Sequence, residues 1–381
     1  MKIINRLLSK LACAEGFEGD AKRRTAAYSN VCEDLSTAST YKSPAKIEFQ
    51  NRSNIKRLTI LLTFILLPFS EVVANSQEYF EKANALIIEG KWQEAIDSFD
   101  LAIKHKPDFA EAYYNRGIAL NELGKLQEAI NSYNLAVKHQ HDYANAYYNK
   151  GNVLDKLGKL QEAINSYDLA IKYKPDFTAA YNNKGFTLNK LGKLQEAINS
   201  YNLAIKYNPD FADAYNNKGI VLGRLGKWQE AIDPFDLAIK HKPDYADAYN
   251  NKGFALNELG KLQEAINSYN LAIKHQHDYA EAYYNKGNVL DKLGKLQEAI
   301  NSYDLAIKYK PNFAEAYNNK GIALGKLAKY QDAIACFDLA IKYNPYHAKA
   351  YHNKSIALNK LGKYSQSEEA FSKAERLRAK H

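Results

Sequence analysis

Apolar and polar residues recur in one fixed order every 34 residues through residues 76–381, so this segment holds nine units. In the second unit, Tyr113, Gly117 and Leu120 lie three or four positions apart, which is the spacing of one face of an α-helix. A fixed period of this size is typical of a solenoid, in which each unit buries its apolar face only against its neighbours. The pattern therefore predicts an all-α array.

A second helix is predicted in each unit, because Leu126, Ala129 and Tyr133 share another helical face. Gly124 falls between the two faces, where a glycine ends a helix by adopting the left-handed conformation. Most units then carry a proline that stops the second helix. These prolines are Pro107, Pro175, Pro209, Pro243, Pro311 and Pro345. Each unit is thus predicted to be two short antiparallel helices.

A glycine also lies inside the first helix of most units, as Gly117 does in the second. Glycine inside a helix costs about 1 kcal/mol relative to alanine, so its recurrence needs a packing reason. We expect the paired helix to approach closely at the small Ala129 position. The large tyrosines are then expected to fill the space between units.

The pattern resembles the tetratricopeptide repeat family over all of residues 76–381. The positions that carry the resemblance in the second unit are Tyr113, Gly117, Leu120, Ala129, Tyr133 and Ala136. The resemblance implies a right-handed α-solenoid superhelix of antiparallel helix pairs, with a concave groove lined by the first helices. The nine predicted units are 76–109, 110–143, 144–177, 178–211, 212–245, 246–279, 280–313, 314–347 and 348–381.

A longer period lies over the short one, since residues 76–211 echo residues 212–347. The two most similar units, 144–177 and 280–313, differ at only two positions. These are Asn145/Glu281 and Asp176/Asn312. This degree of identity indicates recent duplication, so repetition in this chain is weak evidence of selection for a task.

The leader, residues 1–75, differs in composition from the array. Residues 13–50, approximately, are rich in Ser, Thr, Ala and charge without periodicity, which predicts a disordered insert. Within it, residues 17–49 resemble the in-frame peptides that palindromic repeat elements encode in some intracellular bacteria. The resemblance implies a mobile insertion with no function of its own.

Residues 58–74 have the pattern of a secretory signal: a basic flank, an apolar run of twelve and small residues before a polar stretch. The apolar run is shorter than the about 20 residues of a membrane-spanning helix. We expect cleavage near Ala74 and export to the periplasm or the medium. The signal lies far from Met1, so either the insert split an original leader or the true start lies downstream. Alternatively, the signal is unused, and the protein is cytoplasmic or membrane-anchored.

A ladder of asparagines is the best candidate site, because an amide can both donate to and accept from a peptide backbone. By the geometry of the family, this position faces the groove. Such a ladder holds an extended peptide in the superhelical repeats of O-linked N-acetylglucosamine transferase, which the array resembles in this respect. The alternative is a helix-surface residue copied by duplication. The ladder asparagines are Asn115, Asn149, Asn183, Asn217, Asn251, Asn285, Asn319 and Asn353.

Positions beside the ladder vary between units and are candidates for determining specificity. They either anchor apolar side chains of a partner or pack against the neighbouring helix. These candidates are Tyr114, Ile118, Tyr148, Asn152, Phe186, Ile220, Phe254, Tyr284, Asn288 and Ile322.

Charge and chemistry exclude several function classes. The net charge is +9, of which the array carries +5, a weak field without the clustering that nucleic-acid binding requires. Two His-x-His pairs, His139/His141 and His275/His277, offer too few ligands for zinc, so no metal site is predicted. No triad, phosphate loop or paired-carboxylate cleft occurs, so we expect neither an enzyme nor a cofactor.

The sequence therefore predicts a non-catalytic scaffold that binds an extended peptide or a partner protein in its groove. The alternative is a structural component that self-associates or organises an envelope complex. The identity of the partner does not follow from these residues.

Overall fold

The computed structural model describes residues 75–379. The predicted insert at about residues 13–50, the signal-like segment 58–74 and the cleavage site at Ala74 lie outside the described residues. Residues 75–381 cluster as one compact unit. Its described part contains helices, turns and loops, and no strand.

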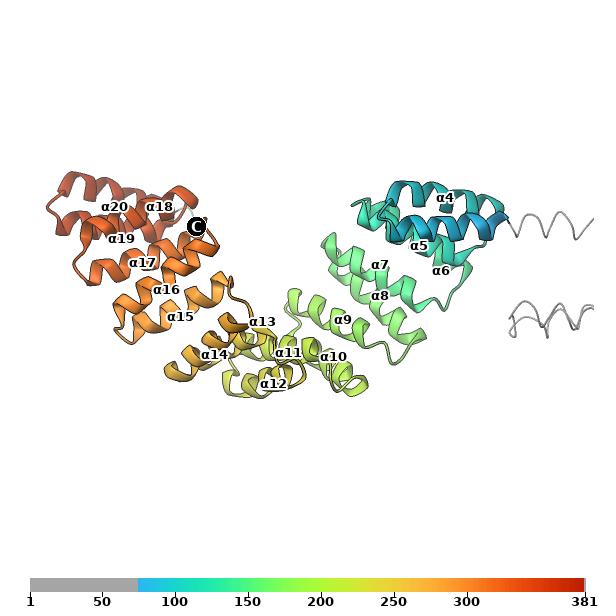
Figure 1. The fold of residues 1–381 in the computed structure, drawn as a ribbon, viewed down its shortest axis with the longest axis horizontal. Helices are drawn as coiled ribbons and strands as arrows, with labels where there is room; N and C mark the ends of the chain where they lie inside the picture. Colours follow the sequence, from blue (N-terminus) through green and yellow to red (C-terminus); the bar gives the residue numbers. More distant parts are fainter. Residues whose placement is uncertain (1–74, 380–381) are drawn as a thin grey trace, which may run out of the picture. The chain divides into compact units, whose positions relative to one another are not determined.

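Each described unit is a pair of helices joined by a short turn (Figure 1). The first helix of the first unit comprises residues 75–88. The first helices of the later units are α5 (Ala110–Glu122), α7 (Ala144–Lys156), α9 (Thr178–Lys190), α11 (Ala212–Arg224), α13 (Ala246–Glu258), α15 (Ala280–Lys292), α17 (Ala314–Lys326) and α19 (Ala348–Lys360). The second helices are α4 (Trp92–His105), α6 (Leu126–His139), α8 (Leu160–Tyr173), α10 (Leu194–Tyr207), α12 (Trp228–His241), α14 (Leu262–His275), α16 (Leu296–Tyr309), α18 (Tyr330–Tyr343) and α20 (Tyr364–Arg378).

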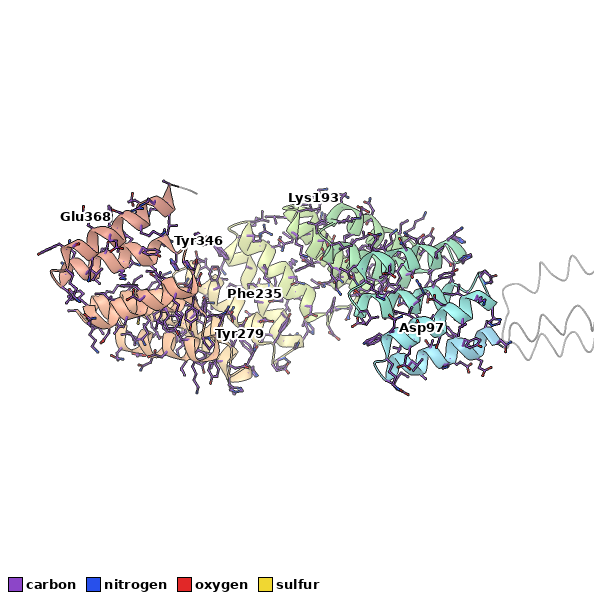
Figure 2. The ribbon with its side chains drawn as sticks, turned by 90° about the horizontal axis from the view of Figure 1, so that it is seen from above. Asp97, Lys193, Phe235, Tyr279, Tyr346 and Glu368 are labelled. Atoms are coloured by element: carbon purple, nitrogen blue, oxygen red, sulfur yellow. The ribbon has the colours of Figure 1, made fainter. Side chains whose placement is uncertain are left out.

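The helices pack in sequence order, as a solenoid requires. Each helix contacts the next one along the chain, and each first helix from α5 to α17 also contacts the first helix of the following unit. The stripes predicted from the sequence face these contacts: Phe235 of α12 is almost fully buried, whereas Tyr346, in the turn before α19, is exposed (Figure 2). The fold class predicted from the 34-residue period is confirmed: an α-solenoid of antiparallel helix pairs.

The turn between the two helices of a unit adopts a left-handed backbone. Gly124 has φ of 73°, and the glycines at this position in other units have φ between 71° and 77°. Ala328 occupies the same position in the eighth unit with φ of 58°. A residue with a Cβ in this conformation is strained by about 1–2 kcal/mol, because the Cβ approaches the following carbonyl oxygen.

The glycine inside the first helix of the seven internal units has a packing reason, but not the predicted one. A Cβ on Gly151 would lie 2.6 Å from Cε1 of Tyr167, and a Cβ on Gly219 would lie 2.6 Å from Cε1 of Phe235. The expectation of close approach at the Ala129 position is therefore wrong. The aromatic ring of the second helix packs directly against the first helix, and glycine provides the space for it.

The last unit departs from this arrangement, because Ser355 replaces the glycine. Phe371, the aromatic residue that follows it, is 45% exposed, whereas its counterpart Phe337 is 3% exposed. Glu368 and Glu375 replace the aliphatic residues found at these positions in α18. Polar residues on the outer side of the last helix suit a repeat that caps the stack.

Within the described range of the chain, no helix combines the length and the apolar character that crossing a membrane requires.

Candidate functional site

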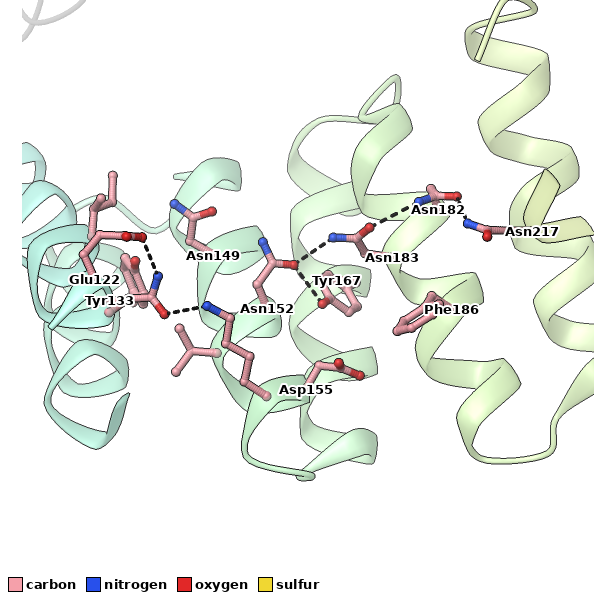
Figure 3. A pocket seen from close by; sticks show the side chains of 14 residues that line it. Glu122, Tyr133, Asn149, Asn152, Asp155, Tyr167, Asn182, Asn183, Phe186 and Asn217 are labelled. Carbon is pink, nitrogen blue, oxygen red and sulfur yellow. Dashed lines mark hydrogen bonds between the residues drawn. The ribbon is translucent and has the colours of Figure 1, made fainter. Parts of the chain in front are cut away.

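A groove of about 610 Å³ opens across the first helices α5, α7, α9 and α11 (Figure 3). Three of the ladder asparagines and three of the specificity candidates lie in it. Its lining comprises Ile118, Asn121, Glu122, Tyr133, Asn149, Asn152, Val153, Asp155, Lys156, Tyr167, Asn182, Asn183, Phe186 and Asn217. The structure thus brings together residues that the sequence placed in separate units, and amide side chains are the most frequent polar group among them.

Every ladder asparagine donates its side-chain amide to the preceding unit. The acceptor is usually the residue just before the preceding ladder position, such as Tyr114 for Asn149 or Asn182 for Asn217. The bonds, with their N–O distances, are Asn115 to Asn84 (2.9 Å), Asn149 to Tyr114 (3.0 Å), Asn183 to Tyr148 (3.0 Å) and Asn152 (2.9 Å), Asn217 to Asn182 (3.1 Å), Asn251 to Asn216 (3.0 Å), Asn285 to Asn250 (3.0 Å), Asn319 to Tyr284 (3.2 Å) and Asn288 (2.9 Å), and Asn353 to Asn318 (2.9 Å). These bonds connect neighbouring units.

The side-chain amide nitrogens of the ladder are therefore engaged within the array, and the atoms left for a ligand are mainly carbonyl oxygens. Asn183 and Asn319 each accept one bond at Oδ1, from Asn182 and Asn318 respectively. Within residues 75–379, the Oδ1 atoms of the other six ladder asparagines have no hydrogen-bond partner. All eight ladder residues are half-buried, so none of them is sealed within the core.

Asn152 is the centre of the polar network in the groove. Its Oδ1 accepts from the hydroxyl of Tyr167 at 2.9 Å and from the amide of Asn183 at 2.9 Å (Figure 3). Burial raises the pKa of Tyr167 well above its usual value, so the hydroxyl keeps its proton and acts as the donor. The same arrangement recurs at Asn288 with Tyr303 and Asn319, again at 2.9 Å for both bonds.

The unit after Asn152 lacks this bond. Phe186 occupies the position of Asn152, and the hydroxyl of Tyr201 is buried without a hydrogen-bond partner. Tyr201 itself is fully buried. The replacement of Asn by Phe therefore leaves an unsatisfied hydroxyl, which costs about 1–3 kcal/mol in a protein interior.

The specificity candidates fall into three groups. Phe186 and Phe254 are each 43% exposed and present apolar surface to solvent. Ile118, Ile220 and Ile322 are half-buried and pack against the core clusters. The tyrosines Tyr114, Tyr148 and Tyr284 accept the ladder amides, and the asparagines Asn152 and Asn288 do so at two of the same units.

Acidic residues of the second helices pair with basic residues of the following unit. Arg116 lies 2.6 Å from Asp100, and Lys184 lies 2.6 Å from Asp168. Lys150 has Asn134 at the equivalent position, and burial lowers its pKa because no carboxylate there compensates for desolvation. Lys286, which has Asn270 in this position, shows the same lowered pKa.

The histidine pairs are used in packing. His139 stacks on Tyr113 with ring centroids 5.5 Å apart, and His275 stacks on Tyr249 at 5.4 Å. Across residues 75–379, no group of three or more His, Cys, Asp or Glu side chains is arranged to hold a metal ion.

The sequence did not reveal the engagement of the ladder amides. The sequence carried the signal as a spacing: each ladder asparagine from Asn149 onward follows, by 35 residues, a tyrosine or an asparagine of the preceding unit. Both side chains carry an oxygen that can accept a hydrogen bond. Exchange of Tyr for Asn at the position 35 residues before the ladder asparagine keeps an oxygen that can accept the ladder amide. These tyrosines and asparagines therefore hold the ladder amides, a role that their variation between units did not indicate.

Family comparisons match the array throughout. A family model described as a TPR repeat matches residues 83–124, 118–158, 187–226, 253–294 and 287–327. Models described as a tetratricopeptide repeat match residues 144–177, 212–245, 314–347, 235–267 and 348–381.

Two solved structures are similar in fold. A tetratricopeptide repeat protein from Parabacteroides merdae is 19% identical, with a TM-score of 0.52 over 66% of this chain and 99% of its own. One chain of the APC/C hetero-tetramer Cut9–Hcn1 is 18% identical, with a TM-score of 0.52 over 73% of this chain and 55% of its own.

Curated proteins match only over short segments. An S-adenosylmethionine:tRNA ribosyltransferase-isomerase of Rickettsia canadensis is 61% identical over 51 residues, which is 13% of this chain and 13% of its own length. An alanine racemase of Rickettsia felis is 63% identical over 38 residues, which is 10% of this chain and 8% of its own length. This chain thus spans only a small part of these relatives.

The repeating units, the packing of the helix pairs and the family matches over residues 83–381 agree with one another. Such repeats serve as protein-interaction scaffolds. The chain belongs to the tetratricopeptide repeat family.

Proposed function

We propose that this protein is a non-catalytic scaffold that holds an extended peptide, or an extended segment of a partner protein, in the groove of its first helices. The observation that carries the proposal is the row of half-buried asparagines, six of which have an Oδ1 atom without a partner in the described residues. Three members of the row, Asn149, Asn183 and Asn217, line the groove. Extended backbone N–H groups are the natural donors to such a row. The apolar surface of Phe186 supplies a contact for side chains.

The expected affinity is modest. Each hydrogen bond contributes about 1 kcal/mol net, and ordering the peptide offsets part of the gain. Several bonds together with apolar contact give an affinity near micromolar, or about −8 kcal/mol. Because the ladder amides already connect the units, the acceptors are held in place before the ligand arrives, which reduces the cost of binding.

The test uses a peptide selected from a displayed library of random 12-residue peptides on the full-length chain. Replacing Asn183, Asn217 and Asn251 together by Ala should weaken its binding, measured by calorimetry, by at least tenfold. The matched control replaces Asn165, Asn199 and Asn267, exposed asparagines of the second helices, by Ala. Unchanged affinity in the ladder variant, with its helicity intact by circular dichroism, would refute the proposal.

Self-association is the second candidate function. The position of Glu368 and Glu375 on the last helix disfavours end-to-end stacking, because a following unit would bury carboxylates. Light scattering of the purified protein tests this, since a stable monomer across the micromolar range would exclude the assembly role.

We also propose that the scaffold is exported through the signal-like segment 58–74. The composition of that segment supports the proposal. Sequencing the N-terminus of the protein recovered from its native cell decides the point. A start just after Ala74 is expected, and an intact Met1 would contradict cleavage.

The insert at about residues 13–50 is proposed to have no role in binding. The composition of the insert, rich in Ser, Thr, Ala and charge without periodicity, supports this. Deleting residues 13–50 should leave the affinity for the selected peptide unchanged.

A further inference from the structure

Two units of the array carry a second asparagine one helical turn after the ladder residue. These are Asn149 with Asn152 on α7 and Asn285 with Asn288 on α15. We call them the first and the second amide pair. Residues three positions apart lie on the same face of a helix, with about 5–6 Å between their Cβ atoms.

Each pair presents one free acceptor and one free donor. In the first pair, the amide of Asn149 is bonded to Tyr114, which leaves its Oδ1 without a partner among the described residues. Asn152 is the reverse, because its Oδ1 accepts two bonds and its amide nitrogen has no partner in the described chain. Figure 3 shows both side chains on the groove side of their helix.

The second pair repeats this arrangement bond for bond. The amide of Asn285 is bonded to Asn250, and Oδ1 of Asn288 accepts from Tyr303 and Asn319. Asn285 Oδ1 and the amide nitrogen of Asn288 therefore remain free in the described structure. All four side chains of the two pairs are half-buried.

A free acceptor beside a free donor matches one residue of an extended peptide. In an extended chain the N–H and the C=O of the same residue point to the same side, as they do in an antiparallel hydrogen-bonded pair. The N–H would donate to Asn149 Oδ1, and the C=O would accept from the amide of Asn152. Such a contact recognises the backbone and not the side chain.

The other described units lack this combination. Ile or Phe stands at the position of Asn152 in most of them. The first unit has Asn84 there, but Glu81 occupies its ladder position, so a free amide carbonyl is missing. The two pairs also differ in their surroundings, because Ile118 and Phe186 flank the first whereas Phe254 and Ile322 flank the second.

We infer that the array is bivalent: it binds two copies of an extended peptide segment, one at each amide pair. The inference rests on the proposed groove function and adds to it the number and the place of the binding sites. The backbone contact is the same at both sites. The reversed order of Ile and Phe gives the two sites different apolar flanks. We therefore expect their affinities to differ by up to about tenfold, the lower end of the effect of one methylene group in an apolar pocket.

The test titrates the library-selected peptide into the full-length chain by calorimetry. Two bound peptides per chain are expected. Asn152→Ile should weaken one site and Asn288→Ile the other, each by about 5–30-fold, the equivalent of losing one or two hydrogen bonds. Isoleucine is a matched replacement, because the array itself carries Ile118, Ile220 and Ile322 in this position.

The outcomes separate the two proposals. One peptide per chain, lost with the ladder variant, would support groove binding and overturn bivalency. Two peptides whose affinities are unaffected by both isoleucine variants would overturn the amide pairs as the sites. A peptide that binds the ladder variant as tightly as the wild type, but loses one site with each isoleucine variant, would overturn the role of the three replaced ladder asparagines and support the amide pairs. The failure of any peptide to be enriched would overturn groove binding and bivalency together. Asn165→Ile, which replaces an exposed asparagine of α8 that does not line the groove, serves as the control and should leave both affinities unchanged.

Discussion

The packed side of each unit, where its two helices meet, and the groove side of its first helix differ in how much their residues vary between units. On the packed side, the internal units are nearly uniform: a glycine of the first helix faces an aromatic ring of the second, as Gly151 faces Tyr167 and Gly219 faces Phe235. On the groove side, one position is Asn152, Phe186, Ile220 and Phe254 in successive units. Uniformity is therefore required where a ring fills a gap of fixed size, and variation is tolerated where side chains meet solvent.

The comparison also separates duplication from constraint. The copied units 144–177 and 280–313 are alike on both sides because they share a recent origin. The unit between Thr178 and Phe211 shares the packed side but not the asparagine of the groove side. Differences between neighbouring units within residues 76–211 therefore say more about which positions are constrained than the identity between residues 76–211 and 212–347 does.

The largest effect is expected where the packed side is broken. Gly151→Ser places a side chain against the ring of Tyr167. In the last unit, where Ser355 stands in place of the glycine, the corresponding Phe371 is exposed. Loss of the buried ring should destabilise the protein by about 2–4 kcal/mol, measured by denaturant unfolding.

The control for this variant is Gly325→Ala. Gly325 also lies inside a first helix, but a Cβ there would meet nothing within 4 Å. Alanine should therefore stabilise the helix by about 0.5–1 kcal/mol, through its higher helix propensity. Equal losses at both glycines would show that helix propensity, and not the aromatic ring, sets the requirement.

A gain is expected at the turn of the eighth unit. Ala328→Gly removes the strain of a left-handed alanine, and glycine is the residue at this turn in the other units. The stability should rise by about 1 kcal/mol, measured as a shift of the unfolding midpoint. A loss of stability would mean that the greater freedom of glycine in the unfolded chain outweighs the strain.

The groove side can be tested with a pair of matched tyrosines. Tyr167→Phe removes a hydroxyl that donates to Asn152 and should cost about 1 kcal/mol. Tyr201→Phe removes a buried hydroxyl without a partner, so it should be neutral or stabilising. Thermal unfolding of both variants measures the difference. An equal loss in the two would contradict the role of Asn152 as the acceptor.

The smallest effect is expected at the lysines without a carboxylate. Asn134→Asp places an acid beside Lys150 in the arrangement of Asp168 beside Lys184. The carboxylate should raise the lowered pKa of Lys150 and add about 0.5 kcal/mol of stability at neutral pH. An acid whose pKa falls on folding stabilises only above that pKa, so the gain should vanish as the pH falls through the titration range of the new aspartate. A gain that persisted at pH 2 would rule out the ion pair.

The fold could be predicted from the sequence because its causes are local and repeated. The spacing of Tyr113, Gly117 and Leu120 sets the helical face, and Gly124 sets the turn. The partner of the helical glycine could not be predicted in the same way. Ala129 and Tyr133 lie on one face, and only the packing shows that the ring of Tyr133 is the group in contact.

The position of three ladder asparagines in a groove could be predicted from the sequence, but the hydrogen bonds of their side chains could not. The sequence placed Asn149, Asn183 and Asn217 in one groove, and the structure has them lining it. Which atoms remain free depends on the bonds to Tyr114, Tyr148 and Asn182, which join residues 35 positions apart in neighbouring units. A peptide role for the ladder stays a prediction.

The central claim is that the groove binds an extended backbone through asparagine side chains. A crystal structure of the full-length chain with the library-selected peptide tests it most directly. The account predicts an extended peptide whose backbone nitrogen lies about 2.7–3.2 Å from Asn149 Oδ1 and donates its N–H to it, and a second copy of the peptide bound in the same way at Asn285. A peptide bound on the second helices, or one held in the groove only through its side chains, would contradict it.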